Sequence, residues 1–260
     1  MVEPHLEVEA KLVILSEGPQ VVTDEIALLT SISGWTLTDR RSVATRDVYF
    51  DLPTRSLEER GVALRLRSMA DDVLIAVKGP EIGVGRALQR EELELAWAGD
   101  ALDRISDRLL SWGIEIPECR LYSASREPHD VLATLGLVPV QDRETRRRLG
   151  DVRQTQPSGN AIAELAVDEV IYHMAGRNVR HHEVEIELSI SSGGAVLEEL
   201  IDWLCQRWPV LEVWPHSKYA TGKAIAALQE RADLEIDGSG LMSQSTYRRL
   251  AEWLSNQRGR

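Results

Sequence analysis

Cysteine is scarce in this sequence: among 260 residues there are two, Cys119 and Cys205, and no CxxC pair. A zinc site with the usual cysteine spacing is therefore not expected, and both thiols are expected to stay reduced, as in a cytoplasmic protein. No apolar run approaches the roughly 20 residues that a membrane helix needs, and the N-terminal residues show neither the basic nor the apolar region of a signal peptide. The sequence thus predicts a cytoplasmic protein without a membrane partner.

Basic residues are in deficit as well. Lysine and arginine number 30 against 42 aspartates and glutamates, which gives a formal net charge of −12 at pH 7. Proteins that bind nucleic acids need a basic surface to neutralise the phosphates, so a nucleic acid polymer is not expected as a partner. A local cationic pocket inside an acidic surface is still compatible with this total.

Polar and apolar residues alternate in eight segments, with the period that is typical of β-strands. These segments are residues 6–14, 45–51, 62–68, 73–79, 87–95, 138–149, 161–172 and 183–189. Stretches with helical periodicity lie at 19–32, 100–113, 125–136, 194–208, 220–232 and 246–258, and Thr23 is the expected N-cap of the first helix. Together they predict an α+β fold: an eight-stranded antiparallel β-barrel with amphipathic helices packed outside.

The charged faces of these strands need an explanation. In the first strand Glu7, Glu9 and Lys11 alternate with apolar residues, and such a strand alone would be interpreted as half-buried with its charges in water. If helices cover the outside of a barrel, however, the apolar faces lie beneath them and the charged faces line the lumen. The same alternation recurs along the chain at Arg65, Arg67, Lys78, Arg90, Glu92, Glu94, Glu164, Asp168, Glu183, Glu185 and Glu187.

One strand, at 138–149, leaves its register open. Arg143, Thr145 and Arg147 share one face, and Glu144, Arg146 and Arg148 share the other. We favour the first set as the lumenal one, because Val140 falls on the second face and apolar residues elsewhere face outward.

Cationic and acidic strands are distinct in this pattern, which indicates a site for a polyanion bound together with a divalent metal ion. Arginine and lysine would hold phosphate oxygens, and carboxylates would hold a hard cation through oxygen ligands. Charges at this density would be too costly to enclose without such guests or water.

The motifs resemble those of the CYTH domain superfamily, also called triphosphate tunnel metalloenzymes. Glu7-Val-Glu-Ala-Lys11 is similar to the ExExK signature of that superfamily, and DVYFDLP, ALRLRS, VKGP, REELEL, EVEIEL and HSKY follow in the family's order. The superfamily includes inorganic triphosphatases, thiamine triphosphatases and class IV adenylate cyclases. LAVDEV, EVEIEL and SKYATGKA are most similar to bacterial inorganic triphosphatases in which the CYTH domain precedes a helical CHAD domain. The resemblance predicts a tunnel domain over 1–223 and a short helical tail over 224–260.

The resemblance also implies roles for individual residues. The expected ligands of Mg²⁺ or Mn²⁺ are Glu7, Glu9, Glu94, Glu183, Glu185 and Glu187. The expected triphosphate-binding residues are Lys11, Arg65, Arg67, Lys78, Arg90, Arg143, Arg147 and Lys218. The expected catalytic residues are Lys11, Lys218, Glu92 and Asp168.

The expected function is metal-dependent hydrolysis of inorganic triphosphate to pyrophosphate and phosphate, because no aromatic platform for a base is evident in the sequence. The alternatives are a thiamine or nucleoside triphosphatase, a class IV adenylate cyclase, or a non-catalytic module that binds polyphosphate. A homodimer is left open. His181 and His182 are expected in a turn, which disfavours a transition-metal site there.

Overall fold

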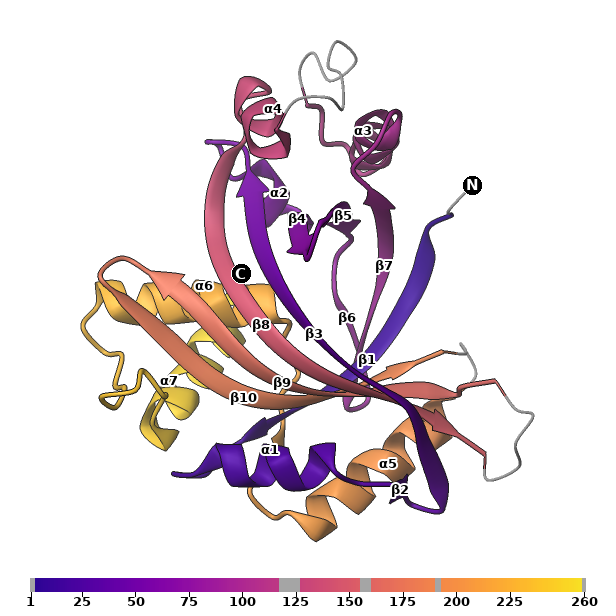
Figure 1. Ribbon diagram of the computed structural model, residues 1–260. Coiled ribbons are helices and arrows are strands. Elements are labelled where there is room, and N and C mark those ends of the chain that lie inside the picture. The colour runs from indigo at the N-terminus through magenta and orange to yellow at the C-terminus, as the bar shows by residue number, and fades with distance from the viewer. Residues whose placement is uncertain (1–2, 117–126, 155–159, 190–192, 259–260) are drawn as a thin grey trace. The chain divides into compact units, whose positions relative to one another are not determined.

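The computed structural model of the chain describes residues 3–116, 127–154, 160–189 and 193–258 (Figure 1). Its strands are β1 (His5–Ile14), β2 (Ser31–Ile32), β3 (Trp35–Asp51), β4 (Ala63–Met69), β5 (Asp72–Lys78), β6 (Ile82–Val84), β7 (Ala87–Ala96), β8 (Val138–Arg153), β9 (Ala163–Met174), β10 (Arg177–Leu188) and β11 (Leu211–Val213). Its helices are α1 (Pro19–Ala27), α2 (Ser56–Glu59), α3 (Ala101–Ser111), α4 (Pro128–Thr134), α5 (Gly194–Arg207), α6 (Lys218–Glu230) and α7 (Gln244–Arg258). Among the described residues, no helix combines the length and the apolar character needed to span a membrane.

The strands belong to a single sheet. Its hydrogen-bonded order is β11-β1-β10-β9-β8-β3-β4-β5-β7-β6, and β2 pairs with β3. Because β1 also pairs with β7, eight of these strands form a ring. The pairs β1–β10, β10–β9, β3–β4, β4–β5 and β5–β7 are antiparallel, which confirms the predicted fold class.

The chain divides into two compact units. Unit 1 contains residues 1–7, 45–82 and 90–143, and unit 2 contains residues 8–44, 83–89 and 144–260. Five strands, β1, β3, β6, β7 and β8, therefore contribute residues to both units. Each unit has its own apolar core and its own group of buried charges.

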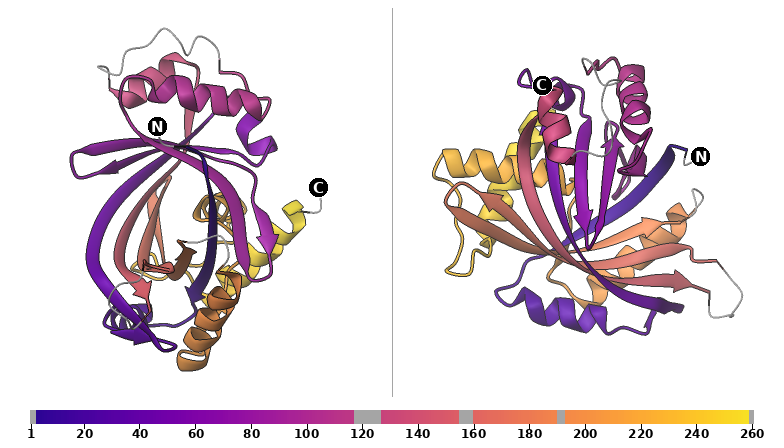
Figure 2. Two further views of the ribbon diagram at one scale, coloured as in Figure 1. Left: turned by 90° about the vertical axis from the view of Figure 1, so that its right-hand side faces the viewer. Right: turned by 45° about the horizontal axis from the view of Figure 1, so that its top comes forward.

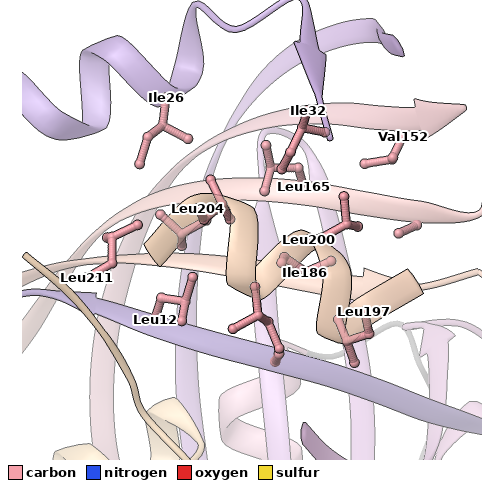
Figure 3. Close-up of a cluster of buried hydrophobic side chains, with 14 of the residues drawn as sticks. Leu12, Ile26, Ile32, Val152, Leu165, Ile186, Leu197, Leu200, Leu204 and Leu211 are labelled. Carbon is pink, nitrogen blue, oxygen red and sulfur yellow. The ribbon is translucent and has the colours of Figure 1, made fainter. Parts of the chain in front are cut away.

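The main core of unit 2 lies between the sheet and two helices, α1 and α5 (Figure 3). Leu12, Leu165 and Ile186 come from β1, β9 and β10, and Leu200 comes from α5. Successive side chains of a strand point to opposite faces, so the charged residues that alternate with these leucines and isoleucines lie on the other face of the sheet. A second apolar cluster holds α6 and α7 against β9 and β10 (Figures 1 and 2).

The core of unit 1 follows the same logic. Leu64 and Leu66 of β4 and Val77 of β5 are buried under helices, with Ile105 and Leu109 of α3 packed in the same cluster. In both units, therefore, helices cover the apolar face of the strands, as the alternation predicted.

Three local predictions are wrong. The first helix begins at Pro19, so Thr23 lies inside it, where its hydroxyl donates to the carbonyl of Gln20. β3 begins ten residues before the predicted 45, because the polar and exposed residues 39–42 interrupt the apolar alternation that sequence reasoning used. His181 and His182 lie within β10 rather than in a turn, paired with β9.

Candidate functional site

Asp47 of β3 is the centre of the buried charges in unit 1. It lies opposite Arg67 in the register of β3 and β4, and Arg67 donates to its two oxygens at 2.7 and 3.0 Å. Arg143 of β8 also donates to Asp47, and to the hydroxyl of Tyr49 at 3.2 Å. Burial opposes ionisation of this fully buried carboxyl, but the guanidiniums of Arg65, Arg67 and Arg143 outweigh it and hold the pKa of Asp47 well below its ordinary range.

A second group in unit 1 forms around Lys78 of β5. Its ammonium lies 2.9 Å from Glu7 and 2.8 Å from Glu92, which is its direct neighbour in the register of β5 and β7. Arg90 donates to Glu7 at 2.5 Å, and Arg65 lies 3.3 Å from Glu92. Burial raises the pKa of Glu92, but the Lys78 ammonium and Arg65 outweigh it, so the pKa is lowered overall.

In unit 2, Lys218 lies among three carboxylates. It is the first residue of α6, and the side chain of Ser217 caps that helix by accepting from the backbone of Ala220. Its ammonium lies 2.9 Å from Asp168 and contacts Glu183 and Glu185. Asp168 and Glu183 are direct neighbours in the register of β9 and β10, which is why their carboxylates meet.

Two further cations complete this group. Lys11 of β1 lies opposite Glu185 at 3.0 Å and also contacts Glu9, two residues earlier on its own strand. Arg147 of β8 donates to both oxygens of Asp168, at 2.9 and 2.6 Å, and contacts Glu185. We call Asp168, Glu183, Glu185, Lys11, Arg147 and Lys218 the unit 2 cluster.

The pKa values of two glutamates in this cluster are shifted in opposite directions. Burial raises the pKa of Glu183 to about 7, more than Lys218 lowers it. Burial acts on Glu185 too, but Arg147, Lys11 and Lys218 together hold its pKa well below the ordinary value. Burial tends to lower the pKa of Lys218, yet its carboxylate neighbours raise it, so this ammonium stays charged.

The raised pKa of Glu183 predicts a pH dependence of stability. Its folded-state value of about 7 exceeds the ordinary value of 4.5, so its contribution is complete below about pH 4.5 and is lost as the pH rises through about 7. We expect the free energy of unfolding of the wild type to fall, relative to that of Glu183→Gln, between these two pH values in the presence of EDTA. Denaturant unfolding of both proteins across this range measures the difference. A constant difference would contradict the assigned protonation.

The unit 2 cluster suits a hard metal ion. Carboxylate oxygens of Asp168, Glu183 and Glu185 come within 4.8 Å of one another, and all three residues are buried. Oxygen donors of this kind are the ligands that Mg²⁺ and Mn²⁺ prefer. Glu187 is half-buried and stands outside this group, as does Glu9.

The structure places the predicted residues in two sets, one in each unit. Glu7, Arg65, Arg67, Lys78, Arg90, Glu92, Glu94 and Arg143 lie in unit 1, where Glu94 accepts from Arg65 at 2.5 Å. Glu9, Lys11, Arg147, Asp168, Glu183, Glu185, Glu187 and Lys218 lie in unit 2. In β8, Arg143, Thr145 and Arg147 share the face that carries the buried charges, and Arg146 and Arg148 face outward.

Sequence reasoning missed Asp47 and Tyr49. Both belong to the quoted segment DVYFDLP, but a single aspartate followed by aromatic residues gave no charged alternation. The signal that could have found them is their register: Asp47 lies opposite Arg67 and Tyr49 lies opposite Arg65.

Comparison with known proteins gives a family model and a set of solved structures. The model described as the CYTH domain matches residues 5–204. HpAC1 of Hippeastrum, a proposed adenylyl cyclase described as having a dominant triphosphatase activity, is 15% identical; the match covers 84% of this chain and 95% of that one, with a TM-score of 0.54. The PH1819 protein of Pyrococcus horikoshii is 18% identical over 86% of this chain and 99% of its own, with a TM-score of 0.49. No curated protein sequence matches the chain.

Proposed function

The chain belongs to the CYTH domain family, and on this premise we propose that it hydrolyses inorganic triphosphate to pyrophosphate and phosphate. The family contains triphosphatases and cyclases, so processing of a triphosphate is its broader activity. Inorganic triphosphate as the substrate is the narrower part that we propose.

The observation that carries the proposal is the unit 2 cluster. Three cations and three carboxylates are packed into one group, buried except for the partly exposed Arg147, and Lys218 contacts every carboxylate. A group that bound only anions would gain nothing from carboxylates beside its guest, whereas a group that binds a phosphate chain together with a metal needs both. The same combination supports hydrolysis over passive polyphosphate binding.

The residues supply positioning and charge rather than a covalent intermediate. Phosphoryl transfer depends mainly on in-line placement and on stabilising charge that develops on the phosphate oxygens. Lys11, Arg147 and Lys218 would bind phosphate oxygens in unit 2, and Arg65, Arg67 and Lys78 are the corresponding cations of unit 1. In unit 2, Asp168 would accept a hydrogen bond from the attacking water and so orient it, and Glu92 is the corresponding carboxylate of unit 1.

The metal would be held by Asp168, Glu183 and Glu185. When bound, Mg²⁺ or Mn²⁺ neutralises charge on the phosphate oxygens and on the leaving group. Because Lys218 now contacts all three carboxylates, its ammonium would be free to bind phosphate once a cation takes over their charge.

The test is phosphate release from inorganic triphosphate, compared with ATP, thiamine triphosphate and long-chain polyphosphate, with Mg²⁺, with Mn²⁺ and with EDTA. We expect turnover that needs metal and is fastest with inorganic triphosphate. Lys11→Met should remove most of it, because it deletes one phosphate-binding cation, while Glu212→Gln, an exposed change on the neighbouring β11, should leave it unchanged. Tight binding of triphosphate without turnover of any of the four would instead indicate a binding module.

A further inference from the structure

A pocket in unit 2 shares one lining residue, Arg147, with the unit 2 cluster, and its other lining residues have no role in the reaction proposed above. Its volume is about 430 Å³, within the range of small-molecule pockets, and its walls come from α1, β3, β8, β9 and β10. α1 and α5 lie on the same side of β9 and β10 (Figure 1). Because α1 contributes Gln20 and Thr23 to the lining, the pocket belongs to this helix-covered side of the sheet. The lining includes Arg146, Arg148, Glu169 and His182.

The ion pairs that now hold the two arginines can be broken at little cost in stability. Arg146 lies 3.1 Å from Glu169 and Arg148 lies 2.7 Å from Asp24, and both pairs are partly exposed to water. Exposed ion pairs contribute little net stability. Each carboxylate also keeps a second partner, since Glu169 contacts Arg180 and Asp24 accepts from Gln20 at 2.8 Å.

His182 is the second observation that points to a ligand. Its side chain is 4% exposed, and among the described residues its Nδ1 atom has no hydrogen-bond partner. An imidazole carries at least one N–H donor, so its Nδ1 can donate to an anion in the pocket. A buried polar atom without a partner is unfavourable, and a ligand in the pocket would give it one.

We propose that this pocket is a separate anion site that binds a phosphate group, either free or as a phosphomonoester, through Arg146, Arg148 and His182. A phosphate group carries close to two negative charges and several acceptor oxygens, so it can accept from both guanidiniums and from the imidazole at once. A monocarboxylate would only replace one surface carboxylate by another and gain little. The proposal does not depend on the reaction of the unit 2 cluster, which lies on the opposite face of β8, where Arg147 points.

The experiment follows the imidazole signals of His182 by NMR while inorganic phosphate is added to the full chain in EDTA, with the signals assigned by His182→Gln. We expect a saturable shift in the wild type. The double variant Arg146→Gln/Arg148→Gln should weaken the apparent affinity at least about tenfold, because two charge-assisted hydrogen bonds are lost. The matched control is Arg41→Gln/Arg153→Gln, which removes the same charge from exposed ion pairs of unit 2 and should leave the affinity unchanged.

A further variant separates this pocket from the unit 2 cluster. Lys218→Met should leave the phosphate-induced shift of the His182 signals as it is in the wild type. The proposal is overturned if the signals of the wild type do not move up to about 10 mM phosphate, which would correspond to a negligible affinity. It is also overturned if the arginine variant titrates like the wild type, or if Lys218→Met abolishes the shift.

Discussion

Lys218→Met is expected to lower kcat for inorganic triphosphate by about 10²–10³-fold, the usual effect of deleting one group that stabilises developing charge. Methionine retains the length of the side chain but removes the ammonium that contacts Asp168, Glu183 and Glu185. The measurement is steady-state phosphate release with saturating Mg²⁺ or Mn²⁺.

The matched control for this change is Lys223→Met. Lys223 is on the same helix, α6, where its ammonium lies over the ring of Tyr219 at 5.2 Å rather than in the cluster. Its replacement should change kcat by less than about twofold, since the proposed reaction assigns it no role. A Lys218→Met enzyme that retained wild-type kcat would exclude Lys218 from the chemistry.

Asp47→Asn is expected to lower the free energy of unfolding by about 3–5 kcal/mol, the effect of removing one partner from a buried ion pair. Its carboxylate is fully buried and is the shared partner of Arg65, Arg67 and Arg143. Asparagine has nearly the same shape, so the decrease in the free energy of unfolding measures the effect of the missing charge rather than a change in packing. Denaturant unfolding at pH 7 measures it.

Asp142→Asn is the control for Asp47. Asp142 accepts two hydrogen bonds from Arg46, at 3.0 and 2.6 Å, but this pair is exposed, so its loss should cost less than about 1 kcal/mol. Because the pKa of Asp47 is lowered in the folded state, its contribution is present above the ordinary value of 3.8 and is lost as the pH falls through the folded value. Equal effects of the two variants at pH 7 would show that Asp47 is not the centre of unit 1.

Much of this arrangement is readable from the sequence because strands alternate with a strict period of two. That period predicted which side of β1, β4, β5 and β10 carries charge, and the position of Val140 selected the correct face of β8. It could not find the first half of β3, where the exposed polar run at 39–42 interrupts the alternation.

Pairing between side chains was beyond such reasoning. Glu183 and Glu185 are equivalent in the alternation, yet their pKa values move in opposite directions. The difference arises because Lys11 and Arg147, on two other strands, contact Glu185. The register between neighbouring strands decides which side chains meet, and the sequence of one strand alone does not specify that register.

The division of β1 between the two units has an evolutionary consequence. Glu7 serves unit 1 and Glu9 serves unit 2, although they are two positions apart on one strand. A deletion of one residue between them would turn every preceding side chain to the other face, so that Glu7 would leave Lys78 and Arg90. Substitutions and changes of loop length can accumulate in such a chain, but selection should remove insertions and deletions inside β1. In distant homologues, the spacing between Glu7 and Glu9 should therefore be conserved more strongly than the identity of most surrounding residues.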